Sequence, residues 1–254
     1  MSTDDHPARN PRQPAGAGSY RLLSVIVPVY NERNTVGEII RRMRRVDLPI
    51  DREIVVVDDG SVDGTDKILA ALEDSTVRVV SHGTNRGKGA AVRTGISAAR
   101  GDLILIQDAD LEYDPGDWPR LVAPILQGKT KVVFGSRYIG ERETTSIAHW
   151  IGDRSLALLA TLLFNATVSD IETGYKVIDR EVLESLGLQA DRFDFEPEIT
   201  ARLLRRGHRV YEVPVTYAGR TPNEGRKFTW RDGVAAGWTL VRLRFEPDPG
   251  ARRR

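Results

Sequence analysis

Short apolar runs rich in β-branched residues alternate with helical segments along the chain, and this alternation restricts the fold more than any other feature. Residues 21–30 (RLLSVIVPVY) and 52–60 (REIVVVDDG) lack polar alternation, which is typical of strands covered on both faces. The segment between them has apolar residues at helical spacing, namely Ile39, Ile40, Met43 and Val46. Thr35 and Glu38 in this segment have the spacing of a capping box. Strand, helix and strand in this order predict a βαβ unit with parallel strands.

The alternation continues through the first half of the chain. We expect further helices at 61–72, 89–100 and 114–128, and further strands at 77–81, 102–107 and 131–137. Asp114 stands directly before Pro115, which is a favourable start for the third of these helices. The sequence therefore predicts an α/β fold with a doubly wound, mostly parallel sheet and helices on both faces. Sheets of this kind bind their ligands at the carboxyl ends of the strands.

The composition favours one large domain at residues 20–245. The chain has 254 residues, of which 40% are hydrophobic and 29% are charged, and this is enough for a sizeable core. Residues 1–19 are rich in proline, glycine and polar side chains and predict a disordered tail rather than a signal peptide. Residues 246–254 predict a flexible basic tail. The net charge of +1 gives no reason to expect a nucleic-acid partner. Because the chain has no cysteine, a metal would be bound by oxygen atoms or by the few scattered histidines.

Polar and acidic motifs follow several of the expected strands. Asp108 and Asp110 in QDADLE come directly after the apolar run GDLILI, DDGSVDG follows the second strand, and PVYNE follows the first. Buried like charges at the end of an apolar strand cost free energy unless a cation or hydrogen-bond donors neutralise them. Carboxylate oxygens are ligands that suit Mg²⁺ or Mn²⁺. The carboxyl end of the sheet is therefore predicted to bind a diphosphate with its metal ion.

Two other interpretations of short motifs fit less well. Residues 83–90 (GTNRGKGA) have three residues between the glycines where a phosphate-binding loop has four, and Gly89 follows the lysine in place of serine or threonine. Residues 58–65 (DDGSVDGT) superficially suggest an aspartyl phosphatase, but the nucleophile of such an enzyme is expected after the first strand. Here the motif follows the second strand.

Seven motifs carry a resemblance to a known family. They are VIVPVYNE (25–32), VVVDDGSVDGT (55–65), NRGKGAAVRTG (85–95), QDADLEYDP (107–115), GSRY (135–138), ETGYKVIDREVL (172–183) and VPVTYAGRTPNEGRKFTWRDG (213–233). Together they resemble family 2 glycosyltransferases of the GT-A fold, most closely the dolichol-phosphate mannose synthase group and its bacterial polyprenyl-phosphate relatives. The resemblance covers residues 22–245.

The resemblance implies a set of donor-binding residues. A nucleotide sugar would be bound by Pro28, Tyr30, Asn31, Glu32, Asp59, Gly87, Lys88, Gly89, Asp108 and Ala109. In this set Asp59 corresponds to the acid that contacts the base. Asp108 and Asp110 correspond to the family's metal motif, and Glu112 stands where the family often has glutamine. As a third metal ligand, Glu112 would either add a negative charge or shift the preference between Mg²⁺ and Mn²⁺.

The resemblance also implies the catalytic set, which is Asp110, Arg137, Arg154, Arg220 and Lys227. The four basic side chains would orient the phosphate of an acceptor. Arg226 stands where the family tends to have serine before that lysine, so the sequence departs from the family pattern in this loop. A phosphate monoester is already ionised near neutral pH and needs no catalytic base. A hydroxyl acceptor would need one, and the candidates are Asp170 and Glu172. Residues 193–200 (FDFEPEIT) are expected to pack as the start of a helix, and the alternative is that Glu196 or Glu198 approaches the donor sugar.

No segment has the length of a membrane span. The longest apolar stretch, residues 156–164, has nine residues, whereas a bilayer span needs about twenty. Residues 148–164 have the pattern of an amphipathic helix that either lies at a membrane interface or packs in the core, and we favour the interface. Residues 230–245 are expected to be a second such helix, which would pack on the domain or contact lipid.

The sequence therefore favours an inverting, metal-dependent glycosyltransferase. We expect it to move a hexose from GDP-mannose or UDP-glucose to a polyprenyl or dolichyl phosphate, with Mg²⁺ or Mn²⁺ as cofactor. Its expected place is the cytoplasmic face of the membrane, as a peripheral protein, with a membrane protein as a further candidate partner. The alternatives are a soluble family 2 glycosyltransferase with a hydroxyl acceptor, and a catalytically silent module that binds nucleotide sugars.

Overall fold

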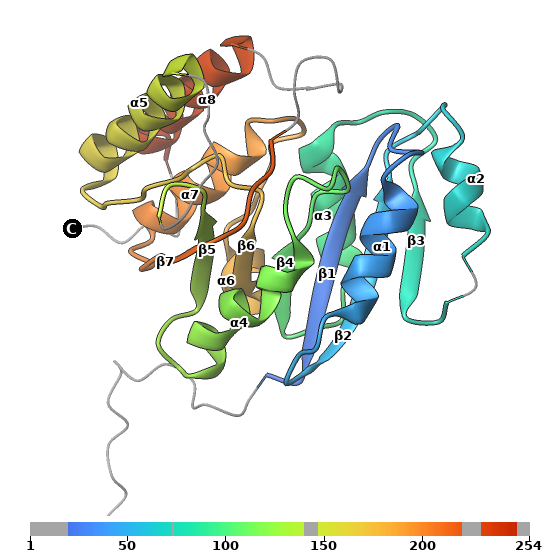
Figure 1. The fold of residues 1–254 in the computed structure, drawn as a ribbon. Coiled ribbons are helices and arrows are strands. Elements are labelled where there is room, and N and C mark those ends of the chain that lie inside the picture. Colours follow the sequence, from blue (N-terminus) through green and yellow to red (C-terminus); the bar gives the residue numbers. More distant parts are fainter. Residues whose placement is uncertain (1–19, 73, 140–146, 220–229, 248–254) are drawn as a thin grey trace, which may run out of the picture.

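A seven-stranded sheet forms the centre of the molecule, in a computed structural model that describes residues 20–72, 74–139, 147–219 and 230–247 (Figure 1). The predicted tail at 1–19 and nearly all of the tail at 246–254 lie outside the described residues. The strand order is β3-β2-β1-β4-β6-β5-β7. The strands are β1 (Leu22–Val29), β2 (Asp51–Asp58), β3 (Val77–Ser81), β4 (Leu103–Ile106), β5 (Val132–Ser136), β6 (Lys176–Asp179) and β7 (Tyr211–Pro214).

The sheet is mostly parallel, as the sequence predicts. β1 pairs in parallel with β2 and β4, and β2 and β3 as well as β5 and β7 are parallel. Within the described residues, β6 is the strand that runs antiparallel, to β4 on one side and to β5 on the other. β6 and β7 are two short strands that the sequence pattern did not predict.

Helices cover both faces of the sheet. They are α1 (Val36–Arg45), α2 (Thr65–Ala70), α3 (Lys88–Ala98), α4 (Trp118–Leu126), α5 (Ile147–Phe164), α6 (Arg180–Ser185), α7 (Phe195–Arg205) and α8 (Trp230–Phe245), and a 3₁₀ turn, Pro115–Asp117, precedes α4. Val25 and Val27 of β1 pack with α1 and α4 on one face, while Ile26 packs with α3 on the other. Both faces of the central strands are therefore buried, which explains why these strands are apolar without alternation.

The two predicted helix starts have different outcomes. Asp114 caps the turn before α4 as expected, because its Oδ1 accepts a hydrogen bond from the Gly116 amide at 2.9 Å. The predicted capping box of α1 is wrong. The Thr35 hydroxyl donates to Glu32 Oε2 at 2.7 Å, and Glu38 forms ion pairs with arginines on its own helix.

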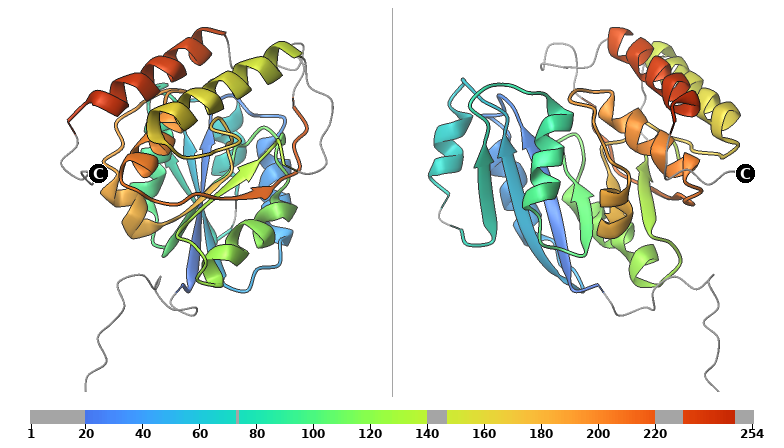
Figure 2. Two further views of the ribbon diagram at one scale, coloured as in Figure 1. Left: turned by 90° about the vertical axis from the view of Figure 1, so that its left-hand side faces the viewer. Right: turned by 180° about the vertical axis from the view of Figure 1, so that it is seen from behind.

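α5 and α8 form an outer layer on one side of the sheet. They lie side by side in the views of Figures 1 and 2, and α8 also packs on α7. Their inner faces bury Ala160 and Leu240, whereas Leu158 and Leu162 of α5 and Trp238 of α8 are exposed. Both helices thus carry apolar side chains on their outer faces as well as on their inner faces. In the described part of the chain no helix is both long enough and apolar enough to span a bilayer.

Candidate active site

The loop after β1 is fastened to the loop after β2. The amide of Asn31 donates to Ser61 Oγ at 3.0 Å, and Asn31 Oδ1 accepts from the amide of Val62 at 2.9 Å. The amide of Glu32 donates to Thr65 Oγ1 at 2.9 Å. Asn31 has a positive φ of 55°, a conformation that asparagine tolerates better than most residues. The predicted nucleotide-binding residues Pro28, Tyr30, Asn31 and Glu32 are therefore held at the carboxyl end of β1.

Asp59 anchors the loop that leads into α3. Its Oδ1 accepts from the amide of Arg86 at 2.9 Å and lies 2.7 Å from His82 Nδ1, and its Oδ2 accepts from the amide of Gly87 at 2.8 Å. The residue is only 2% exposed. Its carboxylate therefore fixes residues 82–87, and a contact with the base of a donor stays a prediction. The partnership with His82 was missed, because residues 23 positions apart carry no sequence signal of a contact.

Gly87 and Gly89 allow α3 to begin against another segment of the protein. A Cβ on either residue would collide with a backbone carbonyl, that of Asp191 for Gly87 and that of Ala190 for Gly89. Gly87 also has a positive φ of 100°. The amide of Ala90 donates to the Asp191 carbonyl at 3.1 Å. The position of Lys88, between the two glycines, is therefore fixed by close backbone packing.

The two predicted metal ligands lie directly after β4, and one of them is paired with Lys88. The Lys88 ammonium lies 2.8 Å from Asp108 Oδ1 and 3.0 Å from Oδ2. Burial alone lowers the pKa of Lys88, but Asp108 and Glu196 outweigh it and hold the pKa well above its usual value. Asp110 Oδ1 accepts from the amide of Glu112 at 3.1 Å. Ala109 between the two acids is buried.

A row of alternating charges continues from Asp108 into the molecule. Lys88 is 3.2 Å from Glu196 Oε1, and Glu196 Oε2 accepts from the ammonium of Lys176. Lys176 has no exposed surface, donates to the Ile171 and Thr173 carbonyls, and lies over the Phe134 ring. These contacts link the ends of β4, α3, α7 and β6. The sequence identified Glu196 as a residue near the donor sugar but gave no signal for its two lysine partners.

The segment 170–174 lies against the acid pair. A Cβ on Gly174 would collide with Asp108 Oδ2, so a larger residue there would push this carboxylate out of its position. Glu172 in this segment has a buried Oε1 that no described residue contacts by a hydrogen bond. Burial, followed by the negative charge of Glu196, raises the pKa of Glu172 from 4.5 to about 8. Glu172 is therefore protonated at neutral pH.

Arg137 and Arg154 lie together beside this segment. Arg137 forms a two-pronged ion pair with Asp170, from Nε to Oδ2 and from Nη2 to Oδ1, both at 2.7 Å. The guanidinium of Arg154, from α5, lies 5.5 Å from the centre of the Tyr138 ring, and that of Arg137 lies 5.6 Å from it. The structure thus brings together two of the four predicted cations. The other two, Arg220 and Lys227, lie outside the described residues, as does Arg226.

The carboxylate oxygens of the acid pair fit a divalent cation whose other coordination positions are filled by a bound ligand. The described residues contain no group of three or more acidic, histidine or cysteine side chains placed to bind a metal. Mg²⁺ is commonly held by one or two carboxylates together with substrate phosphates, and Asp108 and Asp110 supply such a pair. Glu112 Oε2 accepts from the Tyr217 hydroxyl at 2.8 Å. A role of Glu112 as third ligand stays a prediction.

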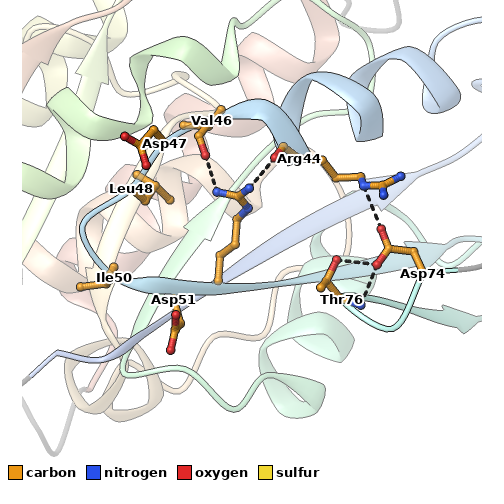
Figure 3. A pocket seen from close by; sticks show the side chains of 9 residues that line it. Arg44, Val46, Asp47, Leu48, Ile50, Asp51, Asp74 and Thr76 are labelled. Atoms are coloured by element: carbon orange, nitrogen blue, oxygen red, sulfur yellow. Dashed lines mark hydrogen bonds and ion pairs between the residues drawn. The ribbon is translucent and has the colours of Figure 1, made fainter.

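A separate hollow of about 480 Å³ lies at the opposite end of β2, next to the end of α1 (Figure 3). Four of its polar side chains, those of Arg44, Arg52, Asp74 and Thr76, bind one another or the backbone. Arg44 pairs with Asp74 at 2.9 Å, and Arg52 donates to the carbonyls of Arg44 and Val46. These contacts satisfy carbonyl groups at the end of α1 and hold that end in place, so we assign the hollow a structural role.

Comparison with known proteins identifies the family. The model of the family "Glycosyl transferase family 2" matches residues 24–187. Polyprenol monophosphomannose synthase of Mycolicibacterium smegmatis is 31% identical over 221 residues, which cover 82% of this chain and 81% of that protein. Dolichol-phosphate mannosyltransferase of Pyrococcus furiosus is 30% identical over 212 residues, covering 80% of this chain and 58% of that longer protein.

The fold has a counterpart of known structure. Glucosyl-3-phosphoglycerate synthase of Mycobacterium tuberculosis, in complex with Mn²⁺, uridine diphosphate and phosphoglyceric acid, superimposes with a TM-score of 0.69 and 26% identity. The match covers 91% of this chain and 81% of that one. It confirms the GT-A fold that the sequence predicts. The chain belongs to glycosyl transferase family 2 and is a glycosyltransferase.

Proposed function

We propose that this glycosyltransferase moves a hexose from a nucleotide sugar to a polyprenyl phosphate at a membrane surface, with inversion at the anomeric carbon. The observation that carries this proposal is the position of the candidate phosphate-binding cations. Arg154 is on α5, the helix that also exposes Leu158 and Leu162. An acceptor that is part phosphate and part hydrocarbon matches a cationic group beside an apolar surface.

On the donor side, the chain supplies two carboxylates at the end of β4. Asp108 and Asp110 would hold Mg²⁺ or Mn²⁺, which when bound neutralises the leaving diphosphate. In this proposal the loops after β1 and β2 and the anchored loop 82–87 would contact the nucleotide. GDP-mannose and UDP-glucose are the donors we expect from the resemblance.

On the acceptor side, Arg137 is oriented before any ligand arrives. Asp170 is 1% exposed and uses both oxygens on Arg137, so it positions this cation and is not available as a base. A phosphate monoester has a second pKa of about 6, so it is already largely deprotonated at neutral pH and attacks without a catalytic base. Direct attack on an α-linked donor gives a β-linked product.

Exposed apolar side chains on α5 and α8 support a peripheral contact with lipid. Leu162 is 74% exposed and Trp238 is 66% exposed. Tryptophan and leucine on one face of a helix with arginine nearby are typical of helices that lie in the bilayer interface, and Arg242 is on α8. We place the enzyme at the cytoplasmic face of the membrane, where a membrane-protein partner would also be accessible.

The relatives support this acceptor class. The relatives from M. smegmatis and P. furiosus are named as a polyprenol monophosphomannose synthase and a dolichol-phosphate mannosyltransferase. A third relative, undecaprenyl-phosphate 4-deoxy-4-formamido-L-arabinose transferase of Pseudomonas aeruginosa, is 32% identical and is covered over 60% of its length.

A second candidate is transfer to a hydroxyl acceptor. It is favoured by Glu172, whose protonated carboxyl has an oxygen without a described partner beside the acid pair. It is also favoured by the structural neighbour that was crystallised with phosphoglyceric acid. In this case Glu172 would act as the base and the rate would rise with pH through about 8.

The test uses purified full-length protein with Mn²⁺ or Mg²⁺ and labelled GDP-mannose, UDP-glucose or UDP-N-acetylglucosamine, with and without a short polyprenyl phosphate. We expect organic-extractable label from one donor only when lipid phosphate and metal are present. Label transferred only to a hydroxyl acceptor would support the second candidate. Full turnover by Asp110→Ala in the presence of a chelator would refute the metal-dependent mechanism.

A further inference from the structure

We propose that Lys88 is a built-in counter-cation of the acid pair and makes binding of the divalent cation depend on the nucleoside diphosphate. The proposal rests on the proposed function for the identity of the cation and of the diphosphate.

The geometry places the Lys88 ammonium where it competes with a metal ion. Both oxygens of Asp108 lie within 3.0 Å of Lys88 Nζ, and the side chains of both residues are only 18% exposed. Water therefore screens this pair poorly. A metal ion that binds Asp108 has to displace the ammonium or share the carboxylate with it.

The local charge disfavours a divalent cation that binds without a diphosphate. The row contains three carboxylates, those of Asp108, Asp110 and Glu196, and the two ammonium groups of Lys88 and Lys176. Its net charge is −1. A divalent cation alone would change this to +1 in a partly buried place, which is unfavourable. A diphosphate that binds with the cation restores the balance and offers Lys88 an anionic partner besides Asp108 and Glu196.

The backbone of Lys88 is fixed beside the acids. It starts α3, and the glycines on either side of it pack on the backbone at 190–191. Glu196 on the far side is already paired with the buried Lys176. The ammonium therefore stays close to Asp108 until another anion comes near.

The experiment measures binding of Mn²⁺ by electron paramagnetic resonance, with full-length protein and without nucleotide. Lys88→Met removes the charge, and Lys88→Gln removes the charge but keeps a hydrogen-bond donor. If one of these two variants does not fold, the other still tests the proposal. Lys88→Arg keeps the charge. Lys67→Met on the exposed side of α2 is the matched control. The binding of UDP and GDP without metal is measured in parallel by calorimetry.

We expect both uncharged variants to bind Mn²⁺ at least about ten-fold more tightly than the wild type, because a cation close to the metal is removed. Lys88→Arg and Lys67→Met should stay within about two-fold of the wild type, and the uncharged variants should bind UDP or GDP more weakly without metal. Equal or weaker Mn²⁺ binding by the uncharged variants would overturn the proposal. A chain that binds Mn²⁺ as expected but transfers no sugar to lipid would leave this inference standing and refute the proposed function.

Discussion

Glu172→Gln should stabilise the protein at alkaline pH and have little effect at acidic pH. Burial and the charge of Glu196 raise the pKa of Glu172 to about 8, while the unfolded chain keeps the ordinary value of 4.5. Below pH 4.5 both states carry the proton, so Glu172 causes no pH dependence there. Between these values only the folded state keeps the proton, and the free energy of unfolding falls as the pH rises. Above pH 8 both states are ionised, and Glu172 causes no further fall in the free energy of unfolding.

The size of the effect follows from the difference in pKa. Each pH unit between the two values corresponds to 1.36 kcal/mol, so the total is at most about 5 kcal/mol, and relaxation around the charged form makes it smaller. Glutamine has nearly the shape of a protonated glutamic acid and never ionises. Glu172→Gln should therefore lack the fall in the free energy of unfolding that Glu172 causes as the pH rises.

The assay is urea unfolding of the wild type and Glu172→Gln at several pH values from 5 to 9. We expect the free energy of unfolding of Glu172→Gln to exceed that of the wild type by near zero at pH 5 and by about 2–5 kcal/mol at pH 9. Glu181→Gln, whose side chain is 90% exposed, is the matched control and should show no such trend. A difference between wild type and Glu172→Gln that stays constant with pH would refute the assignment of a buried, protonated carboxyl.

Four further outcomes test separate parts of the site. Asp170→Asn should cost up to about 3–5 kcal/mol in urea unfolding, because the buried Arg137 loses its two-pronged carboxylate partner and keeps only the longer contact with Asp153 at 3.4 Å; a cost below about 1 kcal/mol would contradict a buried pair. Gly89→Ala should lower the melting temperature and weaken UDP or GDP binding, since the new methyl group meets the Ala190 carbonyl, and unchanged values would contradict that packing. His82→Ala should weaken nucleotide binding more than it changes stability, because Asp59 loses a partner that holds loop 82–87; unaltered binding measured by calorimetry would oppose this. Leu158→Ser together with Leu162→Ser should reduce sedimentation with anionic vesicles several-fold while circular dichroism stays unchanged, and full binding would place the lipid contact elsewhere.

The parallel part of the fold was predictable because burial on both faces leaves a direct mark on the sequence. β1, β2 and β4 are apolar runs between helical segments, and their ends carry the acids that the resemblance assigns to the site. The reversed strand β6 was not predictable in this way. Its sequence, KVID, has two apolar residues between two charged ones, whereas β4, of the same length, is the apolar run LILI, and neither sequence indicates the direction of the strand.

Contacts between distant residues explain most of what the sequence could not reveal. Thr35 has a capping-box partner at the right spacing, yet its hydroxyl binds the nearer carboxylate of Glu32. The helix predicted at 61–72 begins only at Thr65, because Asp63 and Gly64 form a turn before it. Lys88, Glu196 and Lys176 are far apart along the chain, and only the fold makes them neighbours.

Transfer to a polyprenyl phosphate is the central claim, and competition between acceptors tests it most directly. The donor that supports turnover is offered together with equal amounts of a polyprenyl phosphate, the corresponding polyprenol and 3-phosphoglycerate, and the labelled products are separated. We predict that the label enters the polyprenyl phosphate alone, since that acceptor matches both the arginine pair and the apolar face of α5. Label in the polyprenol or in 3-phosphoglycerate, with none in the lipid phosphate, would contradict the account.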